Sequence, residues 1–135
     1  MMRSLLFMSL LALSNILMAG PAGAGGQGET IAVIGTGRVG GALGPRFAEL
    51  GYPVIYGSRS PDGEKAGELV ARSPGSRAAS PEDAAAAAQI VVLAVPWKGI
   101  EATLDRLGSM DGKIIIDITN ALQVNADRMM EMSVD

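Results

Sequence analysis

The chain has 135 residues, of which 48% are hydrophobic and 19% charged, and its formal net charge is -3. This composition is typical of a globular protein, and the lack of a basic excess argues against a nucleic-acid partner. Because the sequence has no cysteine and no histidine, it excludes disulfides, thiolate catalysis and an imidazole base, and we predict no metal site.

The first 24 residues have the three-part layout of a secretory signal peptide. Arg3 precedes an apolar run over residues 4–19, and Ala22 and Ala24 follow in A-x-A spacing, which predicts export, for example to the periplasm, with cleavage after Ala24. The run is shorter than the roughly 20 residues of a spanning helix, so no stable membrane span is expected in the mature chain. An uncleaved anchor and a misassigned start, with the true start near Met18 and a cytoplasmic protein, stay open.

The rest of the chain alternates short apolar strands with helices. Strands are predicted at residues 30–35, 53–56, 76–79, 89–96 and 113–118, and helices at 39–50, 61–72, from Pro81 onward after the capping Ser80, and at 100–107. The runs at 89–96 and 113–118 are continuously apolar, as in parallel strands buried on both faces. Pro45 is an anomaly inside the first helix, because it removes a hydrogen bond.

This order of elements predicts an α/β fold with a doubly wound, mostly parallel sheet of the Rossmann NAD(P)-binding type. The domain spans residues 30–122 and follows a spacer at residues 25–29. The tail at residues 123–135 has no periodicity from which an element can be predicted.

A G-x-G-x-x-G pattern lies between the first strand and the first helix, in GTGRVGG at residues 35–41. Alone, the pattern is weak evidence in a chain with 18 glycines. At this position Gly35 can make the tight turn, Gly37 lets the backbone approach a diphosphate, and Gly40 lets helix and strand pack closely. The free N–H groups at the start of the helix favour an anion. We therefore predict a dinucleotide-binding loop in preference to a purely structural glycine turn.

The end of the second strand indicates NADP(H) rather than NAD(H). An acidic residue commonly stands there to bind the adenosine ribose, but this strand runs into Ser58 and Arg59, and the first acid is Asp62. A guanidinium and a hydroxyl suit a 2′-phosphate. Thr36 and Lys65 are further candidates for contact with that phosphate.

An alternative stays open for the same stretch. Ser60, Pro61 and Asp62 have the residue types of a helix cap, and Arg59 would then be a solvated loop residue.

The stretch IAVIGTGRVGGALGPRFAELGYPVIYGSRSP, with a later strand ending AVPW and another ending DITNA, resembles the NADP-binding domain of NADPH-dependent deazaflavin coenzyme (F-420) reductases. The likeness covers about residues 30–122, and pyrroline-5-carboxylate reductases and the reductase domain of certain membrane ferric reductases are similar there. The resemblance implies that Thr36, Ser58 and Arg59 hold the 2′-phosphate. It implies a diphosphate loop of Gly35, Thr36, Gly37, Arg38, Val39 and Gly40, and a nicotinamide end against Ala94, Val95, Pro96 and Trp97, beside Asn120 and Ala121.

Three residues at the nicotinamide end also have purely structural explanations. Pro96 can end a strand, Trp97 can cover the edge of the core, and Asn120 can make a turn through a side-chain hydrogen bond. Both interpretations stay open.

The resemblance implies an oxidoreductase that transfers hydride between NADPH and a second cofactor, such as a deazaflavin or a flavin, or a small-molecule acceptor. Because the cofactor carries the chemistry, no catalytic residue is assigned. Relatives usually continue beyond this point with segments that complete the substrate pocket and a homodimer, and they are cytosolic. The alternative is therefore a non-catalytic NADP-binding module, or a truncated relative that needs a partner for its acceptor site.

Overall fold

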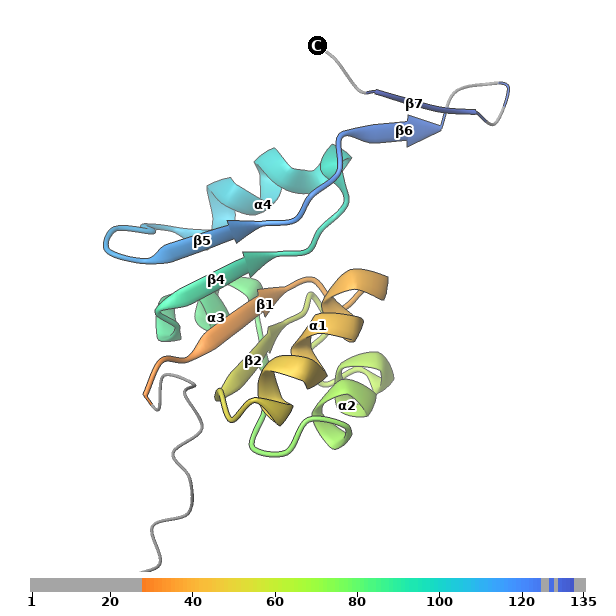
Figure 1. Ribbon diagram of the computed structural model, residues 1–135. Coiled ribbons are helices and arrows are strands. Elements are labelled where there is room, and N and C mark those ends of the chain that lie inside the picture. The colour runs from red at the N-terminus through yellow and green to blue at the C-terminus, as the bar shows by residue number, and fades with distance from the viewer. Residues whose placement is uncertain (1–27, 125–126, 128, 133–135) are drawn as a thin grey trace, which may run out of the picture.

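The computed structural model describes residues 28–124, 127 and 129–132, so the expected signal peptide lies outside the described residues. Strands and helices alternate along the chain as predicted (Figure 1). The elements are β1 (Ile31–Ile34), α1 (Arg38–Glu49), β2 (Val54–Gly57), α2 (Glu64–Ala71), β3 (Arg77–Ala79), α3 (Pro81–Ala87), β4 (Ile90–Leu93), the 3-10 helix η1 (Trp97–Gly99), α4 (Ile100–Leu107), β5 (Ile114–Asp117), β6 (Leu122–Val124) and β7 (Met130–Met132).

Five strands form one parallel sheet in the order β3-β2-β1-β4-β5. Ile34, the last residue of β1, lies opposite Gly57 of β2 and Leu93 of β4, so the carboxyl ends of the three central strands are level. The strand order reverses direction between β1 and β4, which is the point where open α/β sheets bind ligands. This topology confirms the predicted doubly wound fold.

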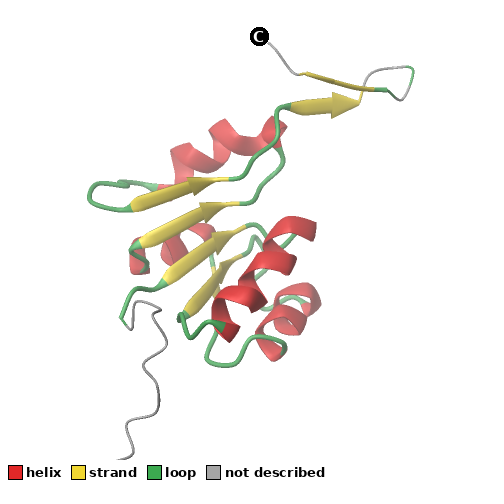
Figure 2. Ribbon diagram, viewed as in Figure 1, coloured by secondary structure: helices red, strands yellow, loops and turns green. Residues whose placement is uncertain are grey.

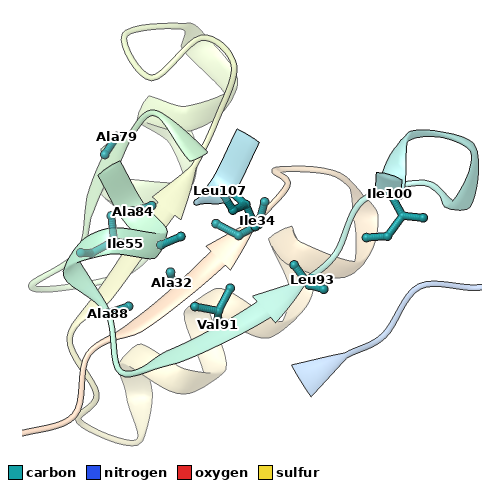
Figure 3. Close-up of a cluster of buried hydrophobic side chains, with 11 residues drawn as sticks. Ala32, Ile34, Ile55, Ala79, Ala84, Ala88, Val91, Leu93, Ile100 and Leu107 are labelled. Carbon is teal, nitrogen blue, oxygen red and sulfur yellow. The ribbon is translucent and has the colours of Figure 1, made fainter. Parts of the chain in front are cut away.

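Helices cover both faces of the sheet (Figure 2). The reason is visible in β1, whose successive side chains point to opposite faces. Ala32 and Ile34 join a buried cluster with residues of α3 and α4, whereas Ile31 and Val33 join a second cluster with residues of α1 and α2. Figure 3 shows the first cluster, in which the small side chains of the alanine-rich α3 let that helix lie close to β1 and β2.

Local sequence explains where the helices begin and end. Ser80 caps α3, since its Oγ accepts a hydrogen bond of 3.1 Å from the Asp83 N–H, and Pro81 occupies the first turn. Gly51 follows α1 with a φ of +90°, a conformation that other residues rarely adopt. Pro45 lies inside α1.

The prediction that residues 113–118 form a buried strand is wrong in its burial. β5 forms, but the side chains of Ile114, Ile115 and Ile116 are 56%, 41% and 40% exposed. The physical reason is its position at the edge of the sheet, where β4 is its one partner among the described strands. Ile114 and Ile116 lie level with Ile90 and Val92, on the face where α1 and α2 contact the other end of the sheet.

The tail contains two strands that the sequence did not predict. β6 and β7 pair antiparallel, with Leu122 opposite Met132, and the pair projects beyond the five-stranded sheet (Figure 1). Strands of three residues are too short to produce a recognisable period. In the part of the chain that the structure describes, no helix has both the length and the apolar character needed to cross a membrane.

Candidate functional site

A cleft of about 580 Å³ opens at the carboxyl ends of β1, β2 and β4, at the switch in strand order. This volume is within the usual range for small-molecule sites. Its walls are formed by the ends of β1 and β2 with the loops after them, by the segment from Ala94 to Gly99 and by α4, with single residues from the starts of α2 and α3. Nine of the predicted cofactor-binding residues line it, namely Gly35, Thr36, Gly37, Ser58, Arg59, Lys65, Ala94, Val95 and Pro96.

Two glycines of the G-x-G-x-x-G pattern, Gly35 in the loop after β1 and Gly40 in α1, are required by close backbone contacts. Gly35 has a φ of +108°, and a Cβ there would lie 2.5 Å from the Ala94 carbonyl oxygen. Its N–H donates a 3.0 Å hydrogen bond to the Gly57 carbonyl, which ties the loop to the end of β2. A Cβ on Gly40 would overlap the Gly35 carbonyl oxygen. Both residues have the structural roles that the G-x-G-x-x-G pattern predicted.

Gly37, the residue before α1, lies in open space. A Cβ there would have no heavy atom within 4 Å. Gly37 makes no side-chain cap, and the first turn of α1 contains no acid. The bond from the Gly41 N–H to the Gly37 carbonyl, 2.8 Å long, opens the helical pattern, so the preceding N–H groups have no partner within the helix. This helix end can therefore receive an anion from the cleft.

The N-terminus of α3 has a side-chain cap and acidic residues in its first turn, both of which the N-terminus of α1 lacks. Ser80 caps α3, and Glu82 and Asp83 place two acids in its first turn. An acidic, capped helix end disfavours an anion, so the N-termini of α1 and α3 differ in charge.

Ser58 is positioned by backbone pairing at the end of β2. Its N–H donates to the Ala79 carbonyl at 2.9 Å, and its side chain is buried. The Ser58 Oγ accepts a 3.2 Å hydrogen bond from the Ser60 N–H. Since the hydroxyl then acts as acceptor in the protein, its proton is left to donate into the cleft.

Arg59 is exposed, and no described residue hydrogen-bonds or pairs with its guanidinium. The helix-cap alternative for Ser60, Pro61 and Asp62 is wrong, because α2 begins at Glu64 with Gly63 at the N-cap position and no side-chain cap. Residues 60–63 instead form a turn that carries Arg59 to the rim of the cleft.

The lining of the cleft is cationic although the chain is acidic. Among the described residues it includes the cations Arg59, Lys65, Lys98 and Arg106 and no carboxylate, whereas the whole chain has a formal charge of -3. Glu82, outside the lining, pairs with Arg106. Such a local excess of cations fits a polyanionic ligand.

The remaining predicted residues lie outside the cleft lining. Arg38 lines a smaller adjoining groove between α1 and α2, which Thr36, Gly37 and Lys65 also reach. Val39 is 49% exposed on α1, and the next residue of the helix, Gly40, is buried. Trp97 is 36% exposed at the start of η1. Asn120 and Ala121 follow β5.

The turn after β5 is made by Asp117. Its Oδ1 accepts hydrogen bonds from the Thr119 N–H at 2.8 Å and the Thr119 hydroxyl at 2.7 Å. These bonds lower the pKa of Asp117 below its ordinary value. The turn is therefore made by the side chain of Asp117, three residues before Asn120.

The wall that α4 contributes was not predicted from the sequence. Lys98 of η1 and Ala102, Thr103 and Arg106 of α4 also line the cleft. The start of α4 could have been expected there, because α4 follows the carboxyl end of β4 and so begins at the ligand-binding edge. Arg106 lies in the last turn of α4, which this rule does not reach.

Comparison with known proteins gives a family match. Residues 30–121 match the family model described as NADP oxidoreductase, coenzyme F420-dependent. A putative F420-dependent NADP-reductase from Arthrobacter sp. FB24 is similar, with 31% identity and a TM-score of 0.70 over 78% of this chain and 51% of that one. A hypothetical protein from Sinorhizobium meliloti has 30% identity and a TM-score of 0.64, with coverage of 76% and 49%.

A more distant similarity links the chain to a reductive aminase from Aspergillus terreus, solved in complex with NADPH and ethyl-5-oxohexanoate, at 26% identity and a TM-score of 0.58. The alignment covers 68% of this chain and 32% of the aminase. The chain therefore spans about half or less of the length of these similar structures. The expectation of NADP(H) agrees with the family description and with the NADPH in the aminase structure. On the family match, which covers well over half of its length, the chain belongs to the NADP oxidoreductase, coenzyme F420-dependent, family.

Proposed function

We propose that the chain binds NADP(H) and serves as the cofactor-binding part of an oxidoreductase that passes hydride between NADPH and a second acceptor. The observation that carries this proposal is the joining of two anion-binding features in one cleft. The uncapped N-terminus of α1 opens onto it beside Gly37, and Ser58 and Arg59 line the same cleft at the end of β2. A dinucleotide with a 2′-phosphate presents two separate phosphate groups that require such a pair of sites.

Each part of the cleft has a distinct task in this proposal. The glycine loop orients the diphosphate through backbone N–H groups. Ser58 donates its hydroxyl proton, and Arg59 donates its guanidinium N–H groups, to the 2′-phosphate. The backbone and small side chains of Ala94 and Val95 support the nicotinamide end and exclude water from one of its faces. The bound cofactor supplies the hydride, so this half of the site needs no acid or base.

We propose a deazaflavin, a flavin or another oxidised small molecule as the acceptor. The test is to incubate the full chain with NADPH and a panel that includes a deazaflavin, a flavin and ferric chelates, and to follow the reduced nicotinamide absorbance. Oxidation that depends on both protein and one acceptor supports the oxidoreductase. NADPH that binds but stays reduced with every acceptor contradicts turnover by this chain alone.

A second candidate function is a binding module whose acceptor site is completed by another polypeptide. The exposed side chains of Ile114, Ile115 and Ile116 on β5 favour it. Burying an isoleucine fully is worth about 1.5–3 kcal/mol, so a covering surface on β5 would be stabilised by several kcal/mol. A homodimer is one such arrangement, and sedimentation equilibrium of the full chain, alone and with NADPH, tests it.

We also propose that residues 1–24 act as an export signal, on the three-part pattern of that segment alone. The mass of the protein recovered from expressing cells tests this, since cleavage after Ala24 removes a defined segment. A full-length mass in the cytoplasmic fraction would contradict export.

A further inference from the structure

The part of the cleft wall that η1 and α4 contribute has no role in the proposed function. Ala102, Thr103 and Arg106 of α4 form it, together with Lys98 of η1. The Thr103 hydroxyl donates a 2.7 Å hydrogen bond to the Gly99 carbonyl, so this side chain is already engaged at the start of the helix. Arg106 therefore presents the largest polar group on the wall.

Arg106 forms an ion pair with Glu82 of α3. Its Nε and one terminal nitrogen both contact the same carboxylate oxygen, at 2.7 Å and 2.6 Å. Two bonds to one oxygen restrict rotation of the planar guanidinium, while its remaining N–H groups stay available. A hydrogen bond from its own backbone N–H, and then the Arg106 guanidinium, lower the pKa of Glu82, so the pair is ionised at neutral pH.

The lining of the cleft has no aromatic side chain among the described residues. A bound purine base gains affinity mainly by stacking on flat groups, either aromatic rings or guanidinium planes. Arg59 and Arg106 are the two guanidinium groups of this lining, and they come from different walls, the loop after β2 and α4. In the proposed function, Ser58 and Arg59 bind the 2′-phosphate at the adenosine end of the cofactor. The adenine base must therefore lie near Ser58 and Arg59.

We propose that Arg106 contacts the adenine base of NADP(H), opposite Arg59, and that Glu82 is the positioning residue that fixes the Arg106 plane. This inference rests on the proposed function and assigns the recognition of the base within it. Arg59 binds the 2′-phosphate, which distinguishes NADPH from NADH, whereas Arg106 contacts the adenine base, which both cofactors contain.

Titrations of the full chain with three ligands separate these roles: NADPH, NADH and reduced nicotinamide mononucleotide, which lacks adenosine. Arg106→Ala should weaken the binding of NADPH and of NADH by the same factor, about 5- to 150-fold from the usual value of stacking on one base. The substitution should leave the affinity for reduced nicotinamide mononucleotide unchanged. Arg106→Lys should not restore affinity, since it returns the charge without the plane, and Glu82→Gln should cause a smaller loss than Arg106→Ala.

Arg46→Ala is the matched control. Arg46 also forms an exposed ion pair, with Glu49 at 2.7 Å, but it lies in α1 and lines neither cleft nor groove. The Arg46→Ala variant should bind all three ligands with the affinity of the wild type, and its unfolding temperature should match that of Arg106→Ala.

Three results would overturn the adenine contact. A loss confined to NADPH, or affinity restored by Arg106→Lys, would assign Arg106 to a phosphate. Affinities of Arg106→Ala that equal those of Arg46→Ala would show that Arg106 makes no contact with the cofactor. In each case the wild type still binds NADPH, so the proposed function stands; if the wild type binds none of the ligands, both proposals fail together.

Discussion

Replacing Gly37 by alanine separates binding from folding more sharply than any other single change in the loop. The added methyl would meet no heavy atom within 4 Å, and the residue has a φ of -75°, which alanine adopts readily. Alanine is a poorer N-cap than glycine, but it also restricts the unfolded chain by about 0.4–1 kcal/mol, so the two effects on stability nearly cancel.

The effect on binding should be much larger. The methyl would occupy the space through which the proposed diphosphate approaches the N-terminus of α1. A hydrogen bond to a charged group is worth about 1.5–3 kcal/mol, so the loss of one bond predicts an affinity for NADPH that is about 10- to 150-fold weaker. The assay is a titration followed by the fluorescence of Trp97, the single tryptophan, together with thermal unfolding of the unliganded protein.

Gly67→Ala is the control, because a Cβ there is equally unhindered but lies in the middle of α2 and outside the cleft lining. It should stabilise the fold by up to about 1 kcal/mol and leave affinity unchanged. If Gly37→Ala binds NADPH as tightly as the wild type, the diphosphate does not lie at this loop and the reasoning fails.

Three further predictions concern the scaffold. Gly40→Ala should destabilise the protein by at least about 2 kcal/mol in urea unfolding, because its Cβ would overlap the Gly35 carbonyl and α1 would have to move from β1; a neutral result would show that the helix is not packed this closely. Ser80→Ala should cost about 1 kcal/mol through loss of the α3 cap, and an unchanged urea midpoint would refute the cap. Burial raises the pKa of Tyr56, which hydrogen-bonds to Ser73 at 2.5 Å, above its ordinary 10.0. The folded state then keeps the phenol proton longer than the unfolded state does, so this stability is complete below about pH 10 and declines as pH rises through the raised pKa. Tyr56→Phe should reduce the alkaline decline, and an identical pH profile would contradict it.

The features that the sequence predicted well depend on residues close together in the chain. The glycine loop, the Ser80 cap and the end of α1 at Gly51 each need only a few neighbouring residues, and they recur at their predicted positions. The same holds for Ser58 and Arg59, because the end of β2 is set by the strand itself.

The features that were predicted wrongly or not at all depend on which elements lie next to one another in space. The run of isoleucines in β5 has the composition of a buried strand, but its exposure is decided by its place at the edge of the sheet. Likewise, Arg106 is 69 positions from Gly37 in the numbering but lines the same cleft. Its partner Glu82 is 24 residues away, and no local pattern joins the two.

The measurement that tests the central claim most directly is the affinity of the full chain for NADPH and NADH, before and after Arg59→Ala. The wild type should bind NADPH more tightly than NADH. The substitution should weaken the affinity for NADPH by about 10- to 150-fold through lost hydrogen bonds to the 2′-phosphate. NADH binding should change much less, so the preference should largely disappear. Equal wild-type affinities, or a preference that survives Arg59→Ala, would contradict the assignment of Ser58 and Arg59 to the 2′-phosphate.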